Sequence, residues 1–215
     1  PALPATLPRP RRVLVLGGSQ GSAQLNRTVP RALAAWRARA GDDRRVPGLT
    51  VVHQAGRHRL DEAARSYADA DLPADIAVEI VRFVDDVAGA MAAAQLILSR
   101  AGAITLAELC AAGRPSLLVP LIGVAGAHQD ANARVLENAG AAVCARPRGA
   151  AATAAVDDPL VADLADALAP LVADDADPRL AAMASAARAL ARSDATDALA
   201  DRLVALAGAE ENDRV

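Results

Sequence analysis

The first residues with a clear chemical capacity form a glycine-rich turn at 17–22 (GGSQGS), directly after the apolar run Val13–Leu16. Its glycines let backbone N–H groups approach an anion, and Ser19 adds a hydroxyl group. A helix that starts here would point its free N–H groups at the same place, which suits a phosphate. The turn is neither a GxGxxG fingerprint nor a P-loop with its lysine. By itself it is equally compatible with a plain connection between a strand and a helix.

A second turn of small residues, 99–105 (SRAGAIT), also leads into a helix. Glu108 lies one turn inside that helix, on the same side as Ile104 and Thr105. Its carboxylate would repel a phosphate but suits a neighbouring diol such as a ribose. Taken alone, Glu108 is explained as a solvated acid that stabilises the helix dipole. Two glycine-rich helix starts that face each other beside a carboxylate are a stronger indication of a nucleotide site.

A third turn runs from Leu121 to Ala127 and leads into a polar cluster, His128-Gln129-Asp130-Ala131-Asn132. Such a cluster at the start of a helix offers hydrogen-bond donors and acceptors that suit sugar hydroxyl groups. A capped surface helix explains the same residues without a ligand.

Other kinds of site find less support in the sequence. The three histidines share no metal-ligand spacing with cysteines or acids, so we expect no metal site. No GxSxG elbow or Cys/His pair is present, which disfavours covalent hydrolase chemistry. His53 and His58 are expected to be structural or solvated. Cys110 and Cys144 are expected to be reduced residues of the core, with a disulfide or a reactive thiol as the alternative.

The charge balance excludes further classes of partner. All 23 basic residues are arginines, they face 26 acidic residues, and the net charge is −3. A weakly acidic chain with one Trp, one Tyr and one Phe has neither the basic patch nor the stacking platform of a nucleic-acid-binding protein. No apolar run reaches the roughly 18 residues of a transmembrane helix, and no secretory signal precedes the first turn. We therefore expect a cytoplasmic location.

The elements that position these turns follow from the hydrophobic pattern. Six short apolar runs alternate with helical segments. The expected strands are 13–16, 49–53, 77–81, 96–99, 116–120 and 142–145. The expected helices between them are 22–39, 60–70, 87–94, 104–112 and 129–138, with a kink or a restart at Pro30. Strands that are apolar throughout and separated by helices predict a doubly wound α/β domain with a six-stranded parallel sheet. Ligands bind such sheets beyond the carboxyl ends of the strands, where the three turns lie.

The two ends of the chain differ from this alternating part. Residues 1–10 contain four prolines and are expected to be a linker. After the last strand we expect helices at 158–173, 178–192 and 195–208. Asp177-Pro178 and Ser193-Asp194 are predicted starts of the last two, because Asp or Ser can cap free N–H groups and Pro fits the first turn. Residues 11–208 would then form one domain, followed by a flexible tail at 209–215.

Motifs in these turns and helices occur in the order and spacing of a known family. They are 16–22 with Leu25-Asn26, then 53–56, 83–86, 99–108, 112–115, 128–129, 132–133 and 139–142. Together they resemble the C-terminal half of the MurG-type glycosyltransferases over about residues 12–145. That family transfers GlcNAc from UDP-GlcNAc to undecaprenyl-diphospho-muramoyl-pentapeptide in peptidoglycan synthesis. The resemblance implies a C-terminal, Rossmann-like domain of the GT-B fold, of the glycosyltransferase family 28 C-terminal type.

The resemblance also implies roles for the residues that match the family motifs. Those implied to contact the diphosphate are Gly18, Ser19, Gln20, Ile104 and Thr105. Those implied to contact the nucleoside are Phe83 and Val84, whose backbone would read the uracil edge, and Glu108, which would bind the ribose. Those implied to meet the sugar are His128 and Gln129, with the backbone of Ala103 nearby. No cofactor and no metal are implied.

The chain departs from the family in two segments. The GGHxxP-like motif of the N-terminal domain, whose His is the presumed base, has no match, and neither does the Asn-Pro-Val-Arg-like segment. We therefore expect the donor half of an inverting enzyme, without a catalytic residue of its own and inactive alone. The lipid-linked acceptor would be held by an N-terminal domain in cis or by a partner chain in trans, at the inner face of the membrane.

Three alternatives remain open from the sequence. A UDP-GlcNAc 2-epimerase would need its own acid/base pairs, and a natural-product glycosyltransferase usually has a different donor loop. A non-catalytic nucleotide- or dinucleotide-binding domain would be expected to carry GxGxxG and an acid after the second strand.

Overall fold

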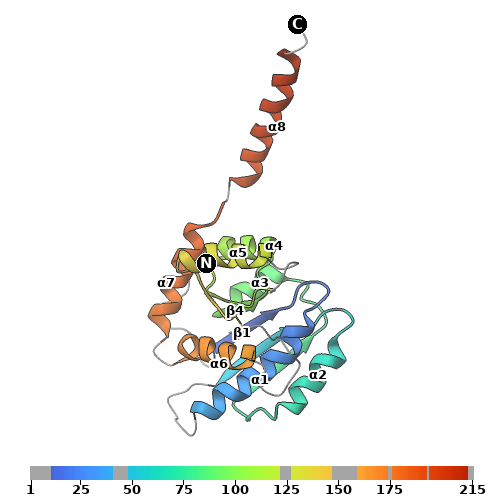
Figure 1. The fold of residues 1–215 in the computed structure, drawn as a ribbon, viewed down its shortest axis with the longest axis vertical. Helices are drawn as coiled ribbons and strands as arrows, with labels where there is room; N and C mark the ends of the chain where they lie inside the picture. The colour runs from blue at the N-terminus through green and yellow to red at the C-terminus, as the bar shows by residue number, and fades with distance from the viewer. Residues whose placement is uncertain are drawn as a thin grey trace.

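The computed structural model describes residues 11–40, 48–121, 127–146, 159–173, 176–192 and 194–212. These residues form a central parallel sheet with helices on both faces (Figure 1). The expected doubly wound α/β architecture is confirmed. The predicted linker at 1–10 lies outside the described residues.

Six parallel strands make up the sheet, in the order β3-β2-β1-β4-β5-β6. Their bounds are β1 Arg11–Leu16, β2 Leu49–Gln54, β3 Ile76–Val81, β4 Leu96–Ser99, β5 Ser116–Leu118 and β6 Ala142–Cys144. β5 ends two residues before the predicted end, and Pro120 has no N–H to extend the ladder. β2 extends one residue further than predicted, to Gln54.

Eight helices connect or follow the strands. They are α1 Ala23–Ala40, α2 Leu60–Asp69, α3 Val87–Ala93, α4 Ala103–Ala112, α5 Ala127–Asn138, α6 Pro159–Val172, α7 Asp177–Ala189 and α8 Ala195–Asn212. α1, α2 and α6 cover one face of the sheet, and α3, α4 and α5 cover the other (Figure 1). α7 contributes residues to both cores.

Two hydrophobic cores result from the strand period of two. In β1, Val13 and Val15 point into the core under α1 and α6, whereas Leu14 and Leu16 point into the core under α3, α4 and α5. All four side chains are buried, which explains why the run is apolar throughout.

Pro30 lies inside α1 and does not restart it. The helix runs unbroken from Ala23 to Ala40, and Pro30 is buried. A proline removes one backbone hydrogen bond of the helix. The neighbouring residues Val29 and Leu33 are buried in the core shared with α6, and this packing offsets the loss.

A buried ion pair ties the first strand to the C-terminal helices. Arg11 is fully buried, its Nη1 lies 2.6 Å from Asp177 Oδ1, and its Nη2 donates to the Ala173 carbonyl at 2.7 Å. The prediction that Asp177 caps α7 is wrong: Ala176 occupies the N-cap position, and no side chain caps the helix. Asp177 instead balances a guanidinium that would be costly to bury alone.

α8 extends away from the rest of the domain (Figure 1). Leu199, Leu203 and Val204 of this helix are exposed. The helix continues to Asn212, four residues beyond the predicted end at residue 208. Ser193, one of the predicted helix starts, lies outside the described residues. Within the described part of the chain, no helix is both long and apolar enough to cross a membrane.

Candidate functional site

The turns that carry the predicted ligand-binding residues meet at the carboxyl edge of the sheet. Leu16 at the end of β1 stands in register with Gln54 of β2 and Ser99 of β4, and Ser99 stands in register with Leu118 of β5. Gln54 in turn pairs with Val81 of β3. The segments that leave these five strands therefore start side by side.

The turn after β1 is shaped by close backbone packing. Gly18 has a φ of +79°, and its carbonyl accepts the Gly21 N–H at 3.0 Å. A Cβ atom on Gly21 would collide with the carbonyl group of Ala55, so the turn rests directly on the segment after β2. Ser22 accepts the Leu25 N–H at 3.3 Å and caps α1. Ser19 and Gln20, both predicted ligand contacts, are exposed at the tip.

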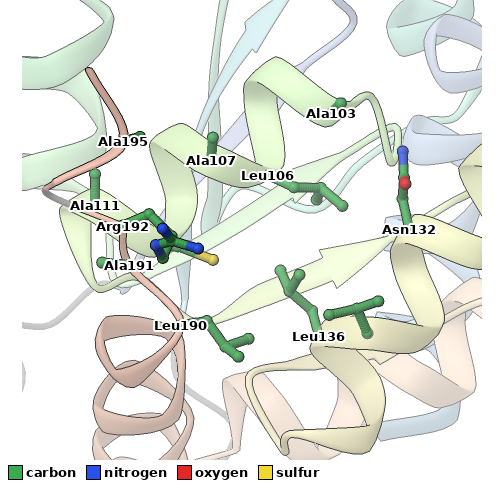
Figure 2. Close-up of a pocket in the computed structure, with 12 residues that line it drawn as sticks. Ala103, Leu106, Ala107, Ala111, Asn132, Leu136, Leu190, Ala191, Arg192 and Ala195 are labelled. Carbon is green, nitrogen blue, oxygen red and sulfur yellow. The ribbon is translucent and has the colours of Figure 1, made fainter. Parts of the chain in front are cut away.

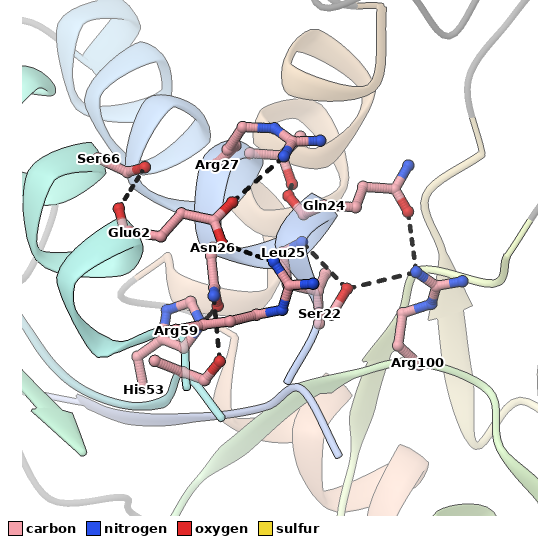
Figure 3. A network of polar contacts seen from close by, with 12 residues as sticks. Ser22, Gln24, Leu25, Asn26, Arg27, His53, Arg59, Glu62, Ser66 and Arg100 are labelled. Carbon is pink, nitrogen blue, oxygen red and sulfur yellow. Dashed lines mark hydrogen bonds and ion pairs between the residues drawn. The ribbon is translucent and has the colours of Figure 1, made fainter. Parts of the chain in front are cut away.

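Arg100 connects this turn to the one that follows β4. Its Nη1 lies 3.0 Å from Gln24 Oε1 and 3.4 Å from Ser22 Oγ (Figure 3). Its Nε is buried without a hydrogen-bond partner among the described residues, and burial lowers the pKa of the guanidinium. Arg100 belongs to the SRAGA motif, but sequence reasoning did not select it as a site residue. Its position after an apolar strand was the available signal.

The N-terminus of α4 faces the same edge. The helix begins at Ala103, and its N-cap residue Gly102 has no side chain to satisfy the first N–H groups. Those of Ile104 and Thr105 are thus oriented for an anion. The Ile104 side chain is 79% exposed. Asn132 of α5 donates to the Ala101 carbonyl at 3.3 Å and holds the preceding turn.

Glu108 lies on the wall of a cavity of about 400 Å³ between α3 and α4. The opposite wall is formed by Val87, Ala88 and Met91 of α3. α3 is capped by Asp86, which accepts the Gly89 N–H at 2.8 Å, so the cavity starts close to the turn that contains Val84. Apart from Glu108 and the buried Arg114, the lining of this cavity is apolar. Such a cavity can take a nucleoside, since the flat faces of its base pack against apolar side chains and its ribose has two hydroxyl groups for a carboxylate.

The Val84 N–H is already hydrogen-bonded in this structure. It donates to Gln54 Oε1 at 2.9 Å, so the prediction that it reads the uracil edge would require this bond to be exchanged. Phe83 is half-buried, and the Arg57 guanidinium lies 4.9 Å from the centre of its ring. The Phe83 side chain thus packs against a cation beside the turn.

His128 and Gln129 lie in the first turn of α5. Gln129 Oε1 accepts the Leu121 N–H at 3.0 Å and so fixes the beginning of the segment after β5. His128 is exposed, and no described contact engages its ring. Residues 122–126 lie outside the described residues. Asn132, one turn further along α5, bonds the Ala101 carbonyl, so the start of α5 lies beside the turn after β4. Among the described contacts, none joins the side chain of His128 or Gln129 to that turn or to the turn after β1.

His53 has the structural role that was expected. Its Nδ1 lies 2.9 Å from the Tyr67 hydroxyl. Its Nε2 lies 3.1 Å from Oδ1 of Asn26, which Figure 3 shows beside it. Asn26 Nδ2 donates to the Ala55 carbonyl at 3.1 Å, so its Oδ1 is left to accept from His53 Nε2–H. Burial lowers the pKa of His53 to about 4 and keeps the imidazole neutral at pH 7. His58, by contrast, is exposed.

A second cavity, of about 480 Å³, lies between α4, α5 and the segment that leads to α8 (Figure 2). Its walls are mainly apolar, with Leu106, Leu136 and Leu190 among them. Ala103 is the one predicted site residue that lines it, at the end where Asn132 also lies (Figure 2). This cavity therefore does not contain the predicted site.

Both cysteines are free thiols, and burial raises the pKa of Cys144 to about 12. Among the described residues, no three His, Cys, Asp or Glu side chains are grouped closely enough to hold a metal ion.

Comparison with known proteins gives one consistent relationship. The glycosyltransferase family 28 C-terminal domain matches residues 12–199 of this chain. An enzyme of Sorangium cellulosum named UDP-N-acetylglucosamine--N-acetylmuramyl-(pentapeptide) pyrophosphoryl-undecaprenol N-acetylglucosamine transferase is 46% identical over 198 residues, 92% of this chain and 44% of that protein. The enzyme of the same name from Halorhodospira halophila is 46% identical over 189 residues, 88% of this chain and 47% of that protein. The chain spans about half the length of these relatives.

Solved structures agree with the sequence relatives. The crystal structure of Acinetobacter baumannii MurG superposes with a TM-score of 0.72 at 32% identity, over 90% of this chain and 49% of that chain. The calicheamicin glycosyltransferase CalG4 is 21% identical, with a TM-score of 0.56 over 96% of this chain and 47% of that chain, and shares the fold.

Proposed function

Because this chain belongs to the family of glycosyltransferase family 28 C-terminal domains, we propose that it binds UDP-GlcNAc as the donor half of an inverting N-acetylglucosaminyltransferase. The acceptor would be a lipid-diphosphate-linked muramoyl-pentapeptide, as the names of the relatives state for those enzymes. Their identities of 46% favour this reaction over that of a natural-product glycosyltransferase, since CalG4, a structure of that class, is only 21% identical to the chain.

One observation carries the proposal: two glycine-rich turns that lead into helices meet at one edge of the sheet, beside a cavity with a carboxylate on its wall. We assign the diphosphate to Gly18, Ser19, Gln20, Ile104 and Thr105, whose backbone and helix N-termini suit an anion. The ribose is assigned to Glu108 and the uracil to the turn of Phe83 and Val84. His128, Gln129 and the Ala103 backbone are assigned to the sugar.

These groups would act mainly on the leaving group. Negative charge builds up on UDP as the bond to the anomeric carbon breaks, and oriented N–H groups stabilise such charge. Transfer also requires an acceptor hydroxyl and a base within hydrogen-bond reach. We propose that both are supplied by a second domain, in the same polypeptide or in a partner chain, peripheral to the inner face of the cell membrane.

A nucleotide panel tests donor binding. Calorimetric titration of the chain with UDP, UDP-GlcNAc, TDP, ADP and NAD should give the tightest binding for the two uridine nucleotides, because the backbone of the Phe83-Val84 turn would pair with the edge of uracil and would clash with a larger purine. Tighter binding of ADP than of UDP would refute the assignment of the nucleoside site.

A transfer assay tests the proposed division of labour. Labelled UDP-GlcNAc and the lipid acceptor should give no transfer with residues 1–215 alone, and transfer should appear when a matching N-terminal domain is added. The second domain holds the acceptor close to the donor, and this proximity contributes much of the rate. Robust turnover by the chain alone would mean that the base lies within this sequence, and His128 would be tested first.

A further inference from the structure

A single buried carboxamide connects two of the turns at the carboxyl edge. Gln54 is the last residue of β2 and is 4% exposed. Its Nε2 donates to the Gly18 carbonyl at 2.9 Å, and its Oε1 accepts the Val84 N–H at 2.9 Å. The turn after β1 and the turn before α3 are therefore joined through one side chain.

These two hydrogen bonds fix the direction of two peptide groups. In a trans peptide the C=O and the N–H point in opposite directions. Because the Gly18 carbonyl points at Gln54, the Ser19 N–H points away from it. Because the Val84 N–H points at Gln54, the Phe83 carbonyl points away from it. Gln54 thus orients one donor in the first turn and one acceptor in the second.

We propose that Gln54 is a positioning residue of the donor site, which holds the diphosphate turn and the uracil turn in a fixed relative orientation. In this arrangement the Val84 N–H stays bonded to Gln54, and the Phe83 carbonyl faces the uracil edge. This inference rests on the proposed function. A site that is already ordered before the ligand arrives loses less conformational entropy on binding. UDP would contact both turns. Loss of the link should therefore weaken UDP binding by more than the accompanying loss of fold stability would explain.

The chemistry of the link distinguishes among substitutions. A carboxamide donates and accepts, whereas an ionised glutamate only accepts and a methionine does neither. Gln54→Glu would therefore keep the bond from Val84 but face the Gly18 carbonyl without a donor. When protonated, the same glutamic acid has one acceptor and one O–H donor, so it can restore both bonds. A buried carboxyl group takes up a proton well above its usual pH range.

The test is the dissociation constant of UDP, measured by calorimetry at about pH 8 and about pH 5.5, with each variant compared to the wild type at the same pH. Gln54→Met should bind UDP about tenfold more weakly at both pH values, since one hydrogen bond is worth about tenfold in affinity. Gln54→Glu should be about as weak at pH 8 and should recover towards the wild type at pH 5.5.

Gln95 offers a matched control at the opposite edge of the sheet. It is 8% exposed, its Oε1 accepts the Arg12 N–H at 2.7 Å, and its Nε2 donates to the Ala93 carbonyl at 3.1 Å. Gln95→Met removes two comparable bonds and should lower the stability of the fold, yet leave the affinity for UDP unchanged.

Three results would overturn the inference while the wild type binds UDP: wild-type affinity in Gln54→Met, no recovery of Gln54→Glu at low pH, or an equal loss in Gln95→Met. If Gln54→Met does not fold, the pH-dependent recovery of Gln54→Glu decides the matter. A wild type that does not bind UDP would instead refute the proposed function.

Discussion

Acidification should destabilise this domain through His53. Burial lowers the pKa of His53 from 6.5 to about 4, because the charged form of the ring would be cut off from water. The neutral ring donates to Asn26 and accepts from Tyr67. Above pH 6.5 the imidazole is neutral in both the folded and the unfolded chain, so its contribution to stability is fully present there. Below pH 6.5 the unfolded chain binds a proton that the folded chain does not bind, and stability falls until about pH 4. The full effect is about 3 kcal/mol, at about 1.4 kcal/mol for each pH unit between the two pKa values.

Urea unfolding at pH 7.0 and pH 5.0 measures this effect. The wild type should lose about 2 kcal/mol from His53 over this interval, since about 1.5 pH units lie below the unfolded pKa. His53→Gln should be less stable at both pH values but should lack this part of the pH dependence. His58→Gln changes an exposed imidazole and should keep the wild-type dependence. Equal pH dependence of stability in the wild type and His53→Gln would refute the reasoning. A midpoint near pH 6.5 in an NMR titration of the His53 ring would refute it as well.

Three further predictions concern the site and the frame that holds it. Glu108→Ala should weaken UDP binding by roughly 1.5–3 kcal/mol, as expected for a hydrogen bond to a charged group. In calorimetry, the same substitution should weaken the binding of 2′-deoxy-UDP by less. If the loss from the substitution and the loss from removing the 2′-hydroxyl simply add, Glu108 does not bond the ribose. Asp177→Ala should lower the free energy of unfolding in urea by more than about 1 kcal/mol, because it removes the carboxylate that lies 2.6 Å from the fully buried Arg11 guanidinium; a smaller loss, typical of exposed pairs, would contradict this. Gly21→Ala should destabilise far more than Gly140→Ala, although both glycines have a φ of +74°, because a Cβ on Gly21 meets the Ala55 carbonyl whereas one on Gly140 meets open space. Similar melting temperatures for the two variants would show that backbone strain alone sets the cost.

The fold was largely predictable because the strands are apolar throughout. Val13–Leu16 could be recognised as a strand buried on both faces, and the helices between the strands then implied a parallel sheet. The failures involve partners distant in sequence. Asp177 has the local pattern of a helix cap, but its carboxylate forms an ion pair with Arg11, which lies more than 160 residues away in the sequence. In the same way, Pro30 is tolerated because of packing that no local pattern reveals.

The site was predictable to the level of turns but not of hydrogen bonds. The rule that ligands bind at the carboxyl ends of strands indicated that the turns after β1 and β4 would meet. It could not reveal that Gln54 accepts a hydrogen bond from the Val84 N–H, because Gln54 ends β2 whereas Val84 lies in the turn after β3, and the two meet only because β2 and β3 are neighbours in the sheet. A glutamine at the end of an apolar strand was the available signal, since a buried amide needs partners.

The ion pair between Arg11 and Asp177 also bears on how the chain folds while it is being made. Within this domain, β1 and α1 are made before α6, which packs against α1, and before Asp177, whose carboxylate lies against Arg11. More than a hundred residues separate α1 and Arg11 from these later partners. At about 5–20 residues per second this interval lasts roughly ten seconds. During that time the nascent domain exposes the apolar surface that α6 later covers, and Arg11 lacks the carboxylate of Asp177, so chaperones can bind there until α6 and α7 close the core.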